Sequence, residues 1–124
     1  MPKVTTAAAP MPLDLQRYSS MDCPLHGLVT ILSGPWTTYI LWLLRNRESM
    51  RFGQIKKQMP SISAKVLTER LRMLEELGIV HRDHEPTIPP KVTYSLTARG
   101  HELDGAIDAL DALALKWSGR TGWT

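Results

Sequence analysis

The stretch from Ser61 to Asp83, SISAKVLTERLRMLEELGIVHRD, decides the fold of this chain. Ser63 is placed to cap a helix, because a serine hydroxyl accepts a hydrogen bond from a free N–H of the first turn. Ile62, before the cap, and Leu67, within the helix, form the apolar pair of a hydrophobic staple. Gly78 supplies the stop, since glycine adopts the left-handed backbone found at helix ends. The stretch therefore predicts a helix that begins after Ser63 and ends at Gly78.

This predicted helix has one apolar and one polar face when its residues are placed about 100° apart on a helical wheel. The apolar face carries four leucines, Leu67, Leu71, Leu74 and Leu77. The polar face carries Lys65, Thr68, Glu69, Arg72 and Glu76. Arg70 falls within the apolar arc, so we expect it to extend towards solvent along that face or to pair with a carboxylate of its own chain.

A β-hairpin is predicted directly after Gly78. The segment IVHRD, residues 79–83, is strand-like, and HEPTIPP, residues 84–90, is too rich in proline for regular structure. In KVTYSL, residues 91–96, Val92, Tyr94 and Leu96 alternate with polar residues, which is typical of a half-buried strand. The sequence thus predicts two strands joined by a tip that prolines stiffen.

Three helices are predicted on the N-terminal side of the opening stretch. Pro24 suits the first turn of a helix that stops at Ser33 and Gly34, and Pro35 suits the first turn of the next. This second helix, PWTTYILWLLRN, is apolar on most of its surface and is expected to be the central core helix. A shorter helical segment, MRFGQIKKQM, ends at Pro60.

One long helix is predicted at the C-terminal end, with Thr97 as its cap. Its apolar stripe comprises Leu103, Ala106, Ile107, Leu110, Leu113, Ala114 and Trp117. We expect that nothing further in the chain covers this stripe.

Length and composition fit one soluble domain. The chain has 124 residues, 43% of them hydrophobic and 22% charged, with a net charge of +3. The longest apolar run, YILWLL, is far shorter than the ~20 residues of a membrane span, so no membrane contact and a cytoplasmic location are expected. Residues 1–20 are expected to form a flexible arm, residues 21–118 the domain and residues 119–124 a tail.

Two short helices joined by a Pro-Ser turn and followed by a hairpin predict a winged helix-turn-helix, a mainly α fold with a small β-hairpin wing. In that arrangement the second helix enters the major groove of DNA, which is about 12 Å wide and therefore requires a polar inserted face. The candidate DNA-contacting residues lie on this helix and beside the hairpin tip: Ser63, Lys65, Thr68, Glu69, Arg72, Arg82, His84 and Lys91.

Three segments, CPLHGLVTILSGPW, RFGQIKKQMPSISAKVLTERLRMLEELGIVHR and PPKVTYSLTARG, resemble the HxlR family of bacterial winged-helix transcription regulators, which is related to the MarR type. The resemblance covers Cys23 to about Trp117. It implies a homodimer formed by terminal helices, which binds inverted-repeat operators near its own or an adjacent gene. We expect this regulator to be a repressor. The expected dimer contacts are Leu103, Ile107, Leu110, Ala114 and Trp117.

The chain departs from the family pattern at two places. Pro35 stands where the family usually has lysine, which removes a possible phosphate contact. Thr93 stands where the family usually has glutamate, which alters the surface of the wing. Neither departure changes the expected fold.

Cys23 is the single cysteine, so the chain has neither an internal disulfide nor a cysteine-rich zinc site. The N–H groups at a helix start favour the reactive thiolate, whereas the charge of Asp22 opposes it. Some relatives sense oxidants or electrophiles through a cysteine at this place, so the resemblance implies a sensor role. The alternative is a small, partly buried structural residue.

Functions other than DNA binding have less support in the sequence. Trp36, Trp42 and Trp117 are most simply core or dimer residues, although a pocket between the first helices and the final helix could take a small aromatic effector. The chain carries no phosphate loop, no cluster of metal ligands and no catalytic triad pattern, so neither an enzyme nor a bound cofactor or metal is expected. A winged-helix module that binds a protein or ligand without binding DNA stays open as an alternative.

Overall fold

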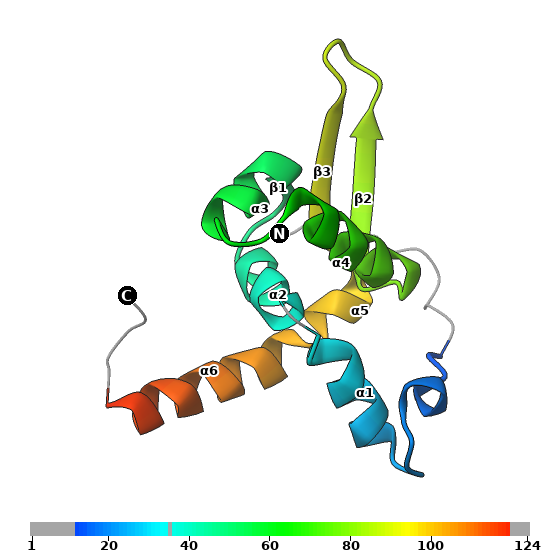
Figure 1. The fold of residues 1–124 in the computed structure, drawn as a ribbon, viewed down its shortest axis with the longest axis vertical. Coiled ribbons are helices and arrows are strands. Elements are labelled where there is room, and N and C mark those ends of the chain that lie inside the picture. Colours follow the sequence, from blue (N-terminus) through cyan, green and yellow to red (C-terminus); the bar gives the residue numbers. More distant parts are fainter. Residues whose placement is uncertain (1–11, 35, 120–124) are drawn as a thin grey trace.

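The computed structural model describes residues 12–34 and 36–119. Most described elements are helices, and a long β-hairpin projects from one side of the molecule (Figure 1). In chain order they are η1 (Leu15–Tyr18), α1 (Pro24–Leu32), α2 (Thr37–Arg45), β1 (Met50–Arg51), α3 (Phe52–Gln58), α4 (Ala64–Glu76), β2 (Val80–Glu85), β3 (Lys91–Leu96), α5 (Ala98–His101) and α6 (Asp104–Ser118). The predicted fold class, a winged helix-turn-helix with additional terminal helices, is confirmed.

The sheet has three antiparallel strands in the order β1-β3-β2. The hairpin pairs Val80 of β2 with Leu96 of β3 near the body of the molecule, and Glu85 with Lys91 near the tip. The sequence did not predict β1, in which Met50 pairs with Tyr94 at the other edge of β3. This short strand joins the base of the wing to the helical part of the chain.

The core lies between α2, α4 and the base of the sheet. Ile40, Leu41 and Leu44 of α2 are fully buried, as expected for a central helix. Leu67 and Leu71 of α4 pack into the same hydrophobic cluster. The leucine face of α4 is therefore turned inward, and its polar face must lie on the outside.

Local hydrogen bonds fix both ends of α4. The Ser63 hydroxyl accepts from the backbone N–H of Val66 at 3.0 Å, which confirms the predicted cap. At the other end Gly78 has φ 76°, and its N–H donates to the carbonyl of Glu75 at 3.0 Å. The N–H of Ile79 donates to the carbonyl of Leu74 at 2.9 Å, which completes a Schellman motif. These two ends hold α4 at a fixed length between the turn and the wing.

The N-terminal segment is more ordered than expected. Residues 12–20 were predicted to belong to a flexible arm, but they contain η1, which lies against α1. Gly27 of α1 permits this contact, because a Cβ at that position would come within 2.1 Å of the carbonyl oxygen of Leu15. The remainder of the predicted arm, residues 1–11, lies outside the described residues.

The connection between α1 and α2 differs from the prediction. Pro35, expected in the first turn of the second helix, lies outside the described residues. Trp36 precedes the helix with φ 72°, a left-handed backbone that costs energy in a residue with a bulky side chain. The helix begins at Thr37, two residues later than the sequence suggested.

The single C-terminal helix predicted from Thr97 is wrong, because the structure divides it into α5 and α6. Thr97 does cap α5, where its hydroxyl accepts from the N–H of Gly100 at 3.0 Å. Leu103 and Ile107, expected in a stripe that the chain leaves uncovered, are buried in the core of the single chain. They are covered because α6 begins beside α2, so a contact between two chains through α6 would have to use residues further along this helix.

No single helix among the described residues is long and apolar enough to cross a membrane. Together α1 and α2 reach the required length and composition, but they form a sharply bent pair. The buried residues of α2 belong to the core of the domain.

Candidate nucleic-acid interface

The outer face of α4 is a continuous polar surface. Its exposed side chains recur every three or four residues, so they form one stripe along the helix. They are Lys65, Thr68, Glu69, Arg72, Glu75 and Glu76. In Figure 1 the hairpin rises beside α4, so the helix and the wing lie on the same part of the molecule.

The hydroxyl groups of Thr68 and of the N-cap Ser63 already form hydrogen bonds with backbone groups of α4. The Thr68 hydroxyl donates to the carbonyl of Ala64 at 2.7 Å, so it offers a ligand its acceptor lone pairs and its methyl group. The Ser63 hydroxyl accepts from Val66, as described above. Of the five candidate DNA-contacting residues on this segment, Lys65, Glu69 and Arg72 therefore have the freest functional groups.

A polar cavity of about 320 Å³ lies between α4 and the wing. Thr68, Arg72 and Glu75 line it from α4, and Arg82 and Tyr94 line it from the two long strands. Arg82 and Tyr94 are opposed in the sheet register, and Tyr94 is buried at the base of the wing. The structure thus brings together two arginines that the sequence places ten residues apart, one on the helix and one on the wing.

The candidate wing residues divide between the two faces of the hairpin. Arg82 and His84 lie opposite Tyr94 and Val92 in the register, and Tyr94 lines the cavity beside α4. His81 and Lys91 belong to the other face, so His81 and His84 point in opposite directions. The Lys91 ammonium lies 3.9 Å from a carboxylate oxygen of Glu85. Lys91 therefore carries less free charge than Arg82.

Two cavity residues were missed by sequence reasoning. Glu75 lies on the last full turn of α4, where only the docking of β2 shows that it shares a cavity with Arg82. Tyr94 was predicted to lie on the apolar face of its strand, which is correct because its side chain is buried. The same side chain also lines the cavity. Both residues reach the cavity only because the hairpin folds back against α4. The periodicity of a single helix or strand does not predict this tertiary contact.

Arg70 lies on the inner side of α4, as expected. It is half-buried, and its guanidinium carbon would lie 3.7 Å from a Cβ placed on Gly34. It therefore reaches back towards the connection between α1 and α2, away from the exposed stripe. Arg70 is therefore not assigned to the candidate DNA-binding surface.

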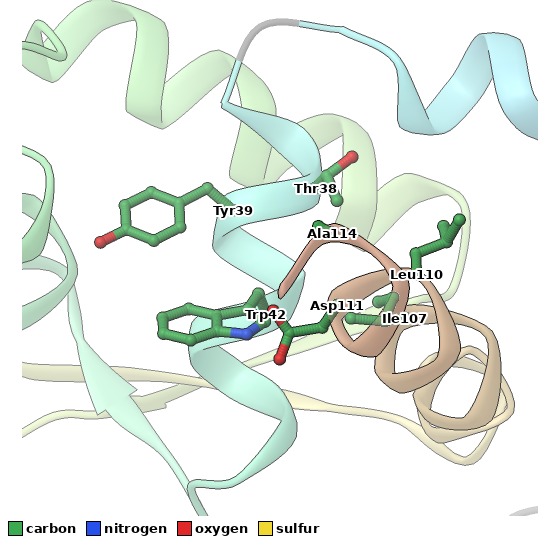
Figure 2. Close-up of a pocket in the computed structure, with 7 residues that line it drawn as sticks. All are labelled: Thr38, Tyr39, Trp42, Ile107, Leu110, Asp111 and Ala114. Atoms are coloured by element: carbon green, nitrogen blue, oxygen red, sulfur yellow. The ribbon is translucent and has the colours of Figure 1, made fainter. Parts of the chain in front are cut away.

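A second, apolar pocket of about 640 Å³ lies between α2 and α6 (Figure 2). Tyr39 and Trp42 form one wall, with ring centroids 5.6 Å apart and an interplanar angle of 21°. The opposite wall comes from α6, and the complete lining is Thr38, Tyr39, Trp42, Ile107, Leu110, Asp111 and Ala114. Of the three tryptophans that suggested an effector site, Trp42 alone lines this pocket.

An ion-pair cluster joins the same two helices. Arg45 of α2 donates from Nε to Asp108 at 2.5 Å, and its Nη2 lies 3.7 Å from Asp111. The guanidinium carbon also lies 5.0 Å from the centroid of the Trp42 ring, in a cation–π contact. The Arg45 side chain is largely buried, so this cluster fixes the start of α6 against the body of the molecule.

Cys23 is the N-cap of α1, and its thiol is free and partly exposed. Its side chain makes no cap hydrogen bond, so the sulfur does not serve as a structural cap. Nearby, the Ser19 hydroxyl and Nδ1 of His26 form a hydrogen bond of 2.8 Å, which ties the preceding segment to the first turns of α1. Among the described residues no group of three or more His, Cys, Asp and Glu side chains could hold a metal ion.

A helix with a polar outer face, anchored from behind by leucines and flanked by a β-hairpin that carries Arg82, defines a winged-helix DNA-binding protein. Residues 31–121 match the family model described as HxlR-like helix-turn-helix. The chain belongs to this family and is a DNA-binding transcriptional regulator. The family consists of regulators, which are not enzymes.

Individual relatives agree with this assignment. An uncharacterised HTH-type transcriptional regulator of Synechocystis sp. is 42% identical over 95 residues, which cover 77% of this chain and 70% of the relative. The reduced form of the transcriptional regulator YodB from B. subtilis has a TM-score of 0.67 and 35% identity, over 77% of this chain and 94% of that chain. The redox regulator HypR in its reduced form has a TM-score of 0.69 and 32% identity, over 80% of this chain and 95% of that chain.

Proposed function

We propose that this protein is a dimeric, sequence-specific repressor whose helix α4 reads an inverted-repeat operator in the major groove. The observation that carries the proposal is the shared cavity of Arg72 and Arg82. An arginine on the inserted helix can bond two acceptors of a guanine, while an arginine on the wing can neutralise a neighbouring phosphate. Lys65 and Glu69 extend the readable stripe towards the N-terminal end of α4.

A binding assay on the protein's own upstream DNA tests this proposal. Fluorescence anisotropy would compare that duplex with a scrambled duplex of equal composition at moderate salt. A specific regulator binds the first more tightly by at least ~10³-fold, and its affinity for either duplex falls as salt rises. A stable protein that shows no duplex affinity would instead support a winged-helix module for protein or ligand binding.

The dimer is the second part of the proposal. Leu110 and Trp117 on α6 are exposed apolar side chains, as are Leu25 and Val29 on α1. Both helices lie on the side of the molecule away from the hairpin (Figure 1), so a dimer through them leaves both α4 helices open to DNA. Half-sites about one helical turn apart, ~34 Å, follow from a twofold arrangement of two wings.

We also propose that Cys23 responds to oxidants or electrophiles. Its partly exposed thiol at a helix start supports this role, and two structural neighbours, YodB and HypR, include a protein named as a redox regulator. Operator binding by the wild type and by Cys23→Ser, each with and without the thiol oxidant diamide, provides the test. Loss of binding confined to oxidised wild type supports a sensor, and equal behaviour of both proteins indicates a structural cysteine.

A small aromatic effector is proposed for the pocket between α2 and α6. Its volume of about 640 Å³ falls in the range of ligand pockets, and Tyr39 and Trp42 offer an aromatic wall. Binding of indole as a probe should be detectable by calorimetry and should lower operator affinity. If Trp42→Phe and the wild type respond to indole equally in operator binding, the pocket does not hold the effector.

A further inference from the structure

The basic charge of this chain lies mainly outside the surface proposed to read DNA. Between Ser63 and Leu96, the segment that contains α4 and the wing, five basic and five acidic side chains balance. Residues 46–58, which include β1 and α3, carry four basic side chains and one acidic one, a net charge of +3. Attraction to phosphates supplies essentially all of the sequence-independent affinity of a protein for DNA. This attraction should therefore come chiefly from residues 46–58.

A polar pocket of about 350 Å³ lies within this basic segment, and we call it the α3 pocket. Its lining consists of Arg47, Ser49, Met50, Gln54, Lys57 and Gln58. It combines two cations, two amides and a hydroxyl group, with the buried Met50 as its one apolar member. Among the described residues no carboxylate lines it, whereas Glu75 lines the cavity beside the wing and Asp111 lines the pocket between α2 and α6. An anion in the α3 pocket would therefore meet no opposing acid in the lining.

The two cations of the α3 pocket are available to a ligand. In the part of the chain that the structure describes, neither the Arg47 guanidinium nor the Lys57 ammonium lies in an ion pair. By contrast, the Lys91 ammonium of the wing lies 3.9 Å from a carboxylate oxygen of Glu85. Two like charges that share one pocket repel each other, and a bound anion offsets this repulsion.

Hydrogen bonds hold the helical wall of the α3 pocket in place. The side-chain oxygen of Gln54 accepts from the backbone N–H of Arg51 at 2.9 Å. The oxygen end of this amide is thereby occupied, and the Nε2 group, which can donate two hydrogen bonds, is its free end. The Tyr39 hydroxyl donates to the backbone carbonyl of Gln58 at 3.3 Å, and Ile55 of α3 is fully buried. This wall is therefore fixed to α2 and to the core before a ligand binds.

The α3 pocket and the cavity of Arg72 and Arg82 lie at opposite edges of the sheet. Met50 of β1 lines the first and Arg82 of β2 lines the second, while β3 lies between the two strands. In Figure 1 α3 lies beside the N-terminal end of α4. Because α4 has 13 residues it is about 20 Å long, so its ends reach the two backbones that border a major groove about 12 Å wide. The α3 pocket is thus placed for a backbone phosphate just beyond the bases that α4 reads.

We propose that the α3 pocket binds a phosphate group, which is held by the charges of Arg47 and Lys57 and by the amide of Gln54. A guanidinium can bond two oxygens of one phosphate, and the lysine ammonium adds a point charge. The position beside α4 makes a backbone phosphate of DNA the expected source, and in this form the inference rests on the proposed function. A small molecule with a phosphate group would offer the same chemistry. Helix α4 then supplies base recognition, and the α3 pocket supplies attraction that does not depend on sequence.

Salt-dependent DNA binding tests the backbone as the source. Arg47→Gln and Lys57→Gln would each be titrated by fluorescence anisotropy against the upstream duplex and its scrambled counterpart at several salt concentrations. Each variant should lose the same roughly 3–10-fold in affinity on both duplexes, and the slope of log affinity against log salt should become shallower by about 0.9, the value of one phosphate contact. The preference for the upstream duplex should stay unchanged. A preference that falls in either variant would indicate a base contact and overturn the assignment.

Lys56→Gln is the matched control, because Lys56 neighbours Lys57 on α3 but does not line the pocket. It removes the same charge from the same helix and should leave the affinity and the salt slope nearly unchanged. Lys57→Arg keeps the charge in the pocket and should keep the wild-type slope. A loss in Lys56→Gln as large as that in Lys57→Gln would mean diffuse attraction by the whole segment, which would contradict a site in the pocket.

Inorganic phosphate tests the other source. It would be added to the protein without DNA at constant ionic strength, and NMR would follow the amide shifts of residues 47–58 in the wild type and in Lys57→Gln. Saturable shifts in the wild type alone, with unchanged salt slopes on DNA, would identify a small molecule as the source. Shallower slopes without phosphate binding would identify the DNA backbone, and both results together would mean that the pocket accepts either source.

The proposal fails if both variants keep the wild-type salt slope and the wild type shows no saturable shifts with phosphate. Failure of the proposed function looks different, because the wild type would then bind neither duplex. In that case the phosphate titration alone decides whether the α3 pocket is a binding site. Circular dichroism of each variant confirms that the exposed substitutions leave the fold intact.

Discussion

Arg72 carries the largest share of the proposed base recognition. Its side chain is exposed, lies on the outward line of α4 and shares a cavity with Arg82 of the wing. A guanidinium at this place can bond two acceptors on one guanine, whereas the ammonium of Lys65 acts as a single charge. Specificity should therefore depend more on Arg72 than on the lysines of the same surface.

Arg72→Ala is expected to weaken operator binding by about 1–3 kcal/mol and to reduce the preference for the operator over scrambled DNA. Anisotropy titrations on both duplexes provide the measurement. Arg17→Ala, which removes the same charge from exposed η1, is the matched control and should change little. An equal loss on both duplexes would show that Arg72 contacts phosphate and reads no base.

Individual residues on α4 were predictable, because burial and capping there follow local periodicity. Leu67 and Leu71 are buried, Ser63 caps the helix, and Arg70 points inward. Glu75 was not predictable as a cavity residue, because its neighbour Arg82 comes from a strand whose docking depends on tertiary packing. The sequence therefore predicted the polar face of α4, but it did not predict that Arg82 of the wing lies beside this face.

The N-terminal cap of α4 contributes to the stability of the helix that we propose reads DNA. Ser63→Ala removes the hydroxyl that accepts from Val66, so we expect the free energy of unfolding to fall by about 1 kcal/mol. Urea denaturation followed by circular dichroism measures the change, and Ser61→Ala on the preceding exposed turn is the control. Equal stability of the two variants would mean that the cap contributes nothing to the fold.

The contact between η1 and α1 depends on the missing side chain of Gly27. A Cβ there would lie 2.1 Å from the carbonyl oxygen of Leu15, so Gly27→Ala must displace η1. We expect faster hydrogen exchange in residues 12–20 and a loss of stability on the order of 1–3 kcal/mol. Gly105→Ala, where a Cβ meets nothing within 4 Å, is the control and should be neutral or stabilising.

Protection of residues 12–20 that is unchanged in Gly27→Ala would contradict the docking of η1. The sequence missed this element because it has only four residues and ordinary helical periodicity needs a longer stretch. The same reason explains β1, which spans two residues and exists through its pairing with β3. Long elements with repeated patterns were predictable, and short ones fixed by tertiary contacts were not.

At the scale of the whole molecule, some residues of α6 pack into the core of the chain and others are exposed at its surface. The sequence predicted one uncovered stripe, but the bend between α5 and α6 turns Ile107 into the core and leaves Leu110 exposed. A charge at Ile107 would therefore damage the fold itself. A charge at Leu110, which is 61% exposed, tests association without disturbing the core.

Leu110→Asp is expected to yield a folded monomer, because a contact through the exposed apolar residues Leu110, Leu113 and Trp117 of α6 cannot bury an unpaired carboxylate. Its operator affinity should fall by at least ~10-fold, since a monomer engages only one half-site. Light scattering gives the mass and circular dichroism checks the fold, with Ala112→Asp on the opposite side of α6 as the control. A dimeric Leu110→Asp protein would place the contact between chains elsewhere.

The account depends on the outer face of α4 entering the major groove, and one measurement tests that entry most directly. A hydroxyl-radical footprint of the operator with wild type and with Arg72→Ala would map the protected positions. The account predicts two protected half-sites about one helical turn, ~34 Å, apart, both weakened in the variant. A footprint identical for both proteins, or no footprint at protein concentrations that keep the chain dimeric, would contradict the claim that α4 reads DNA.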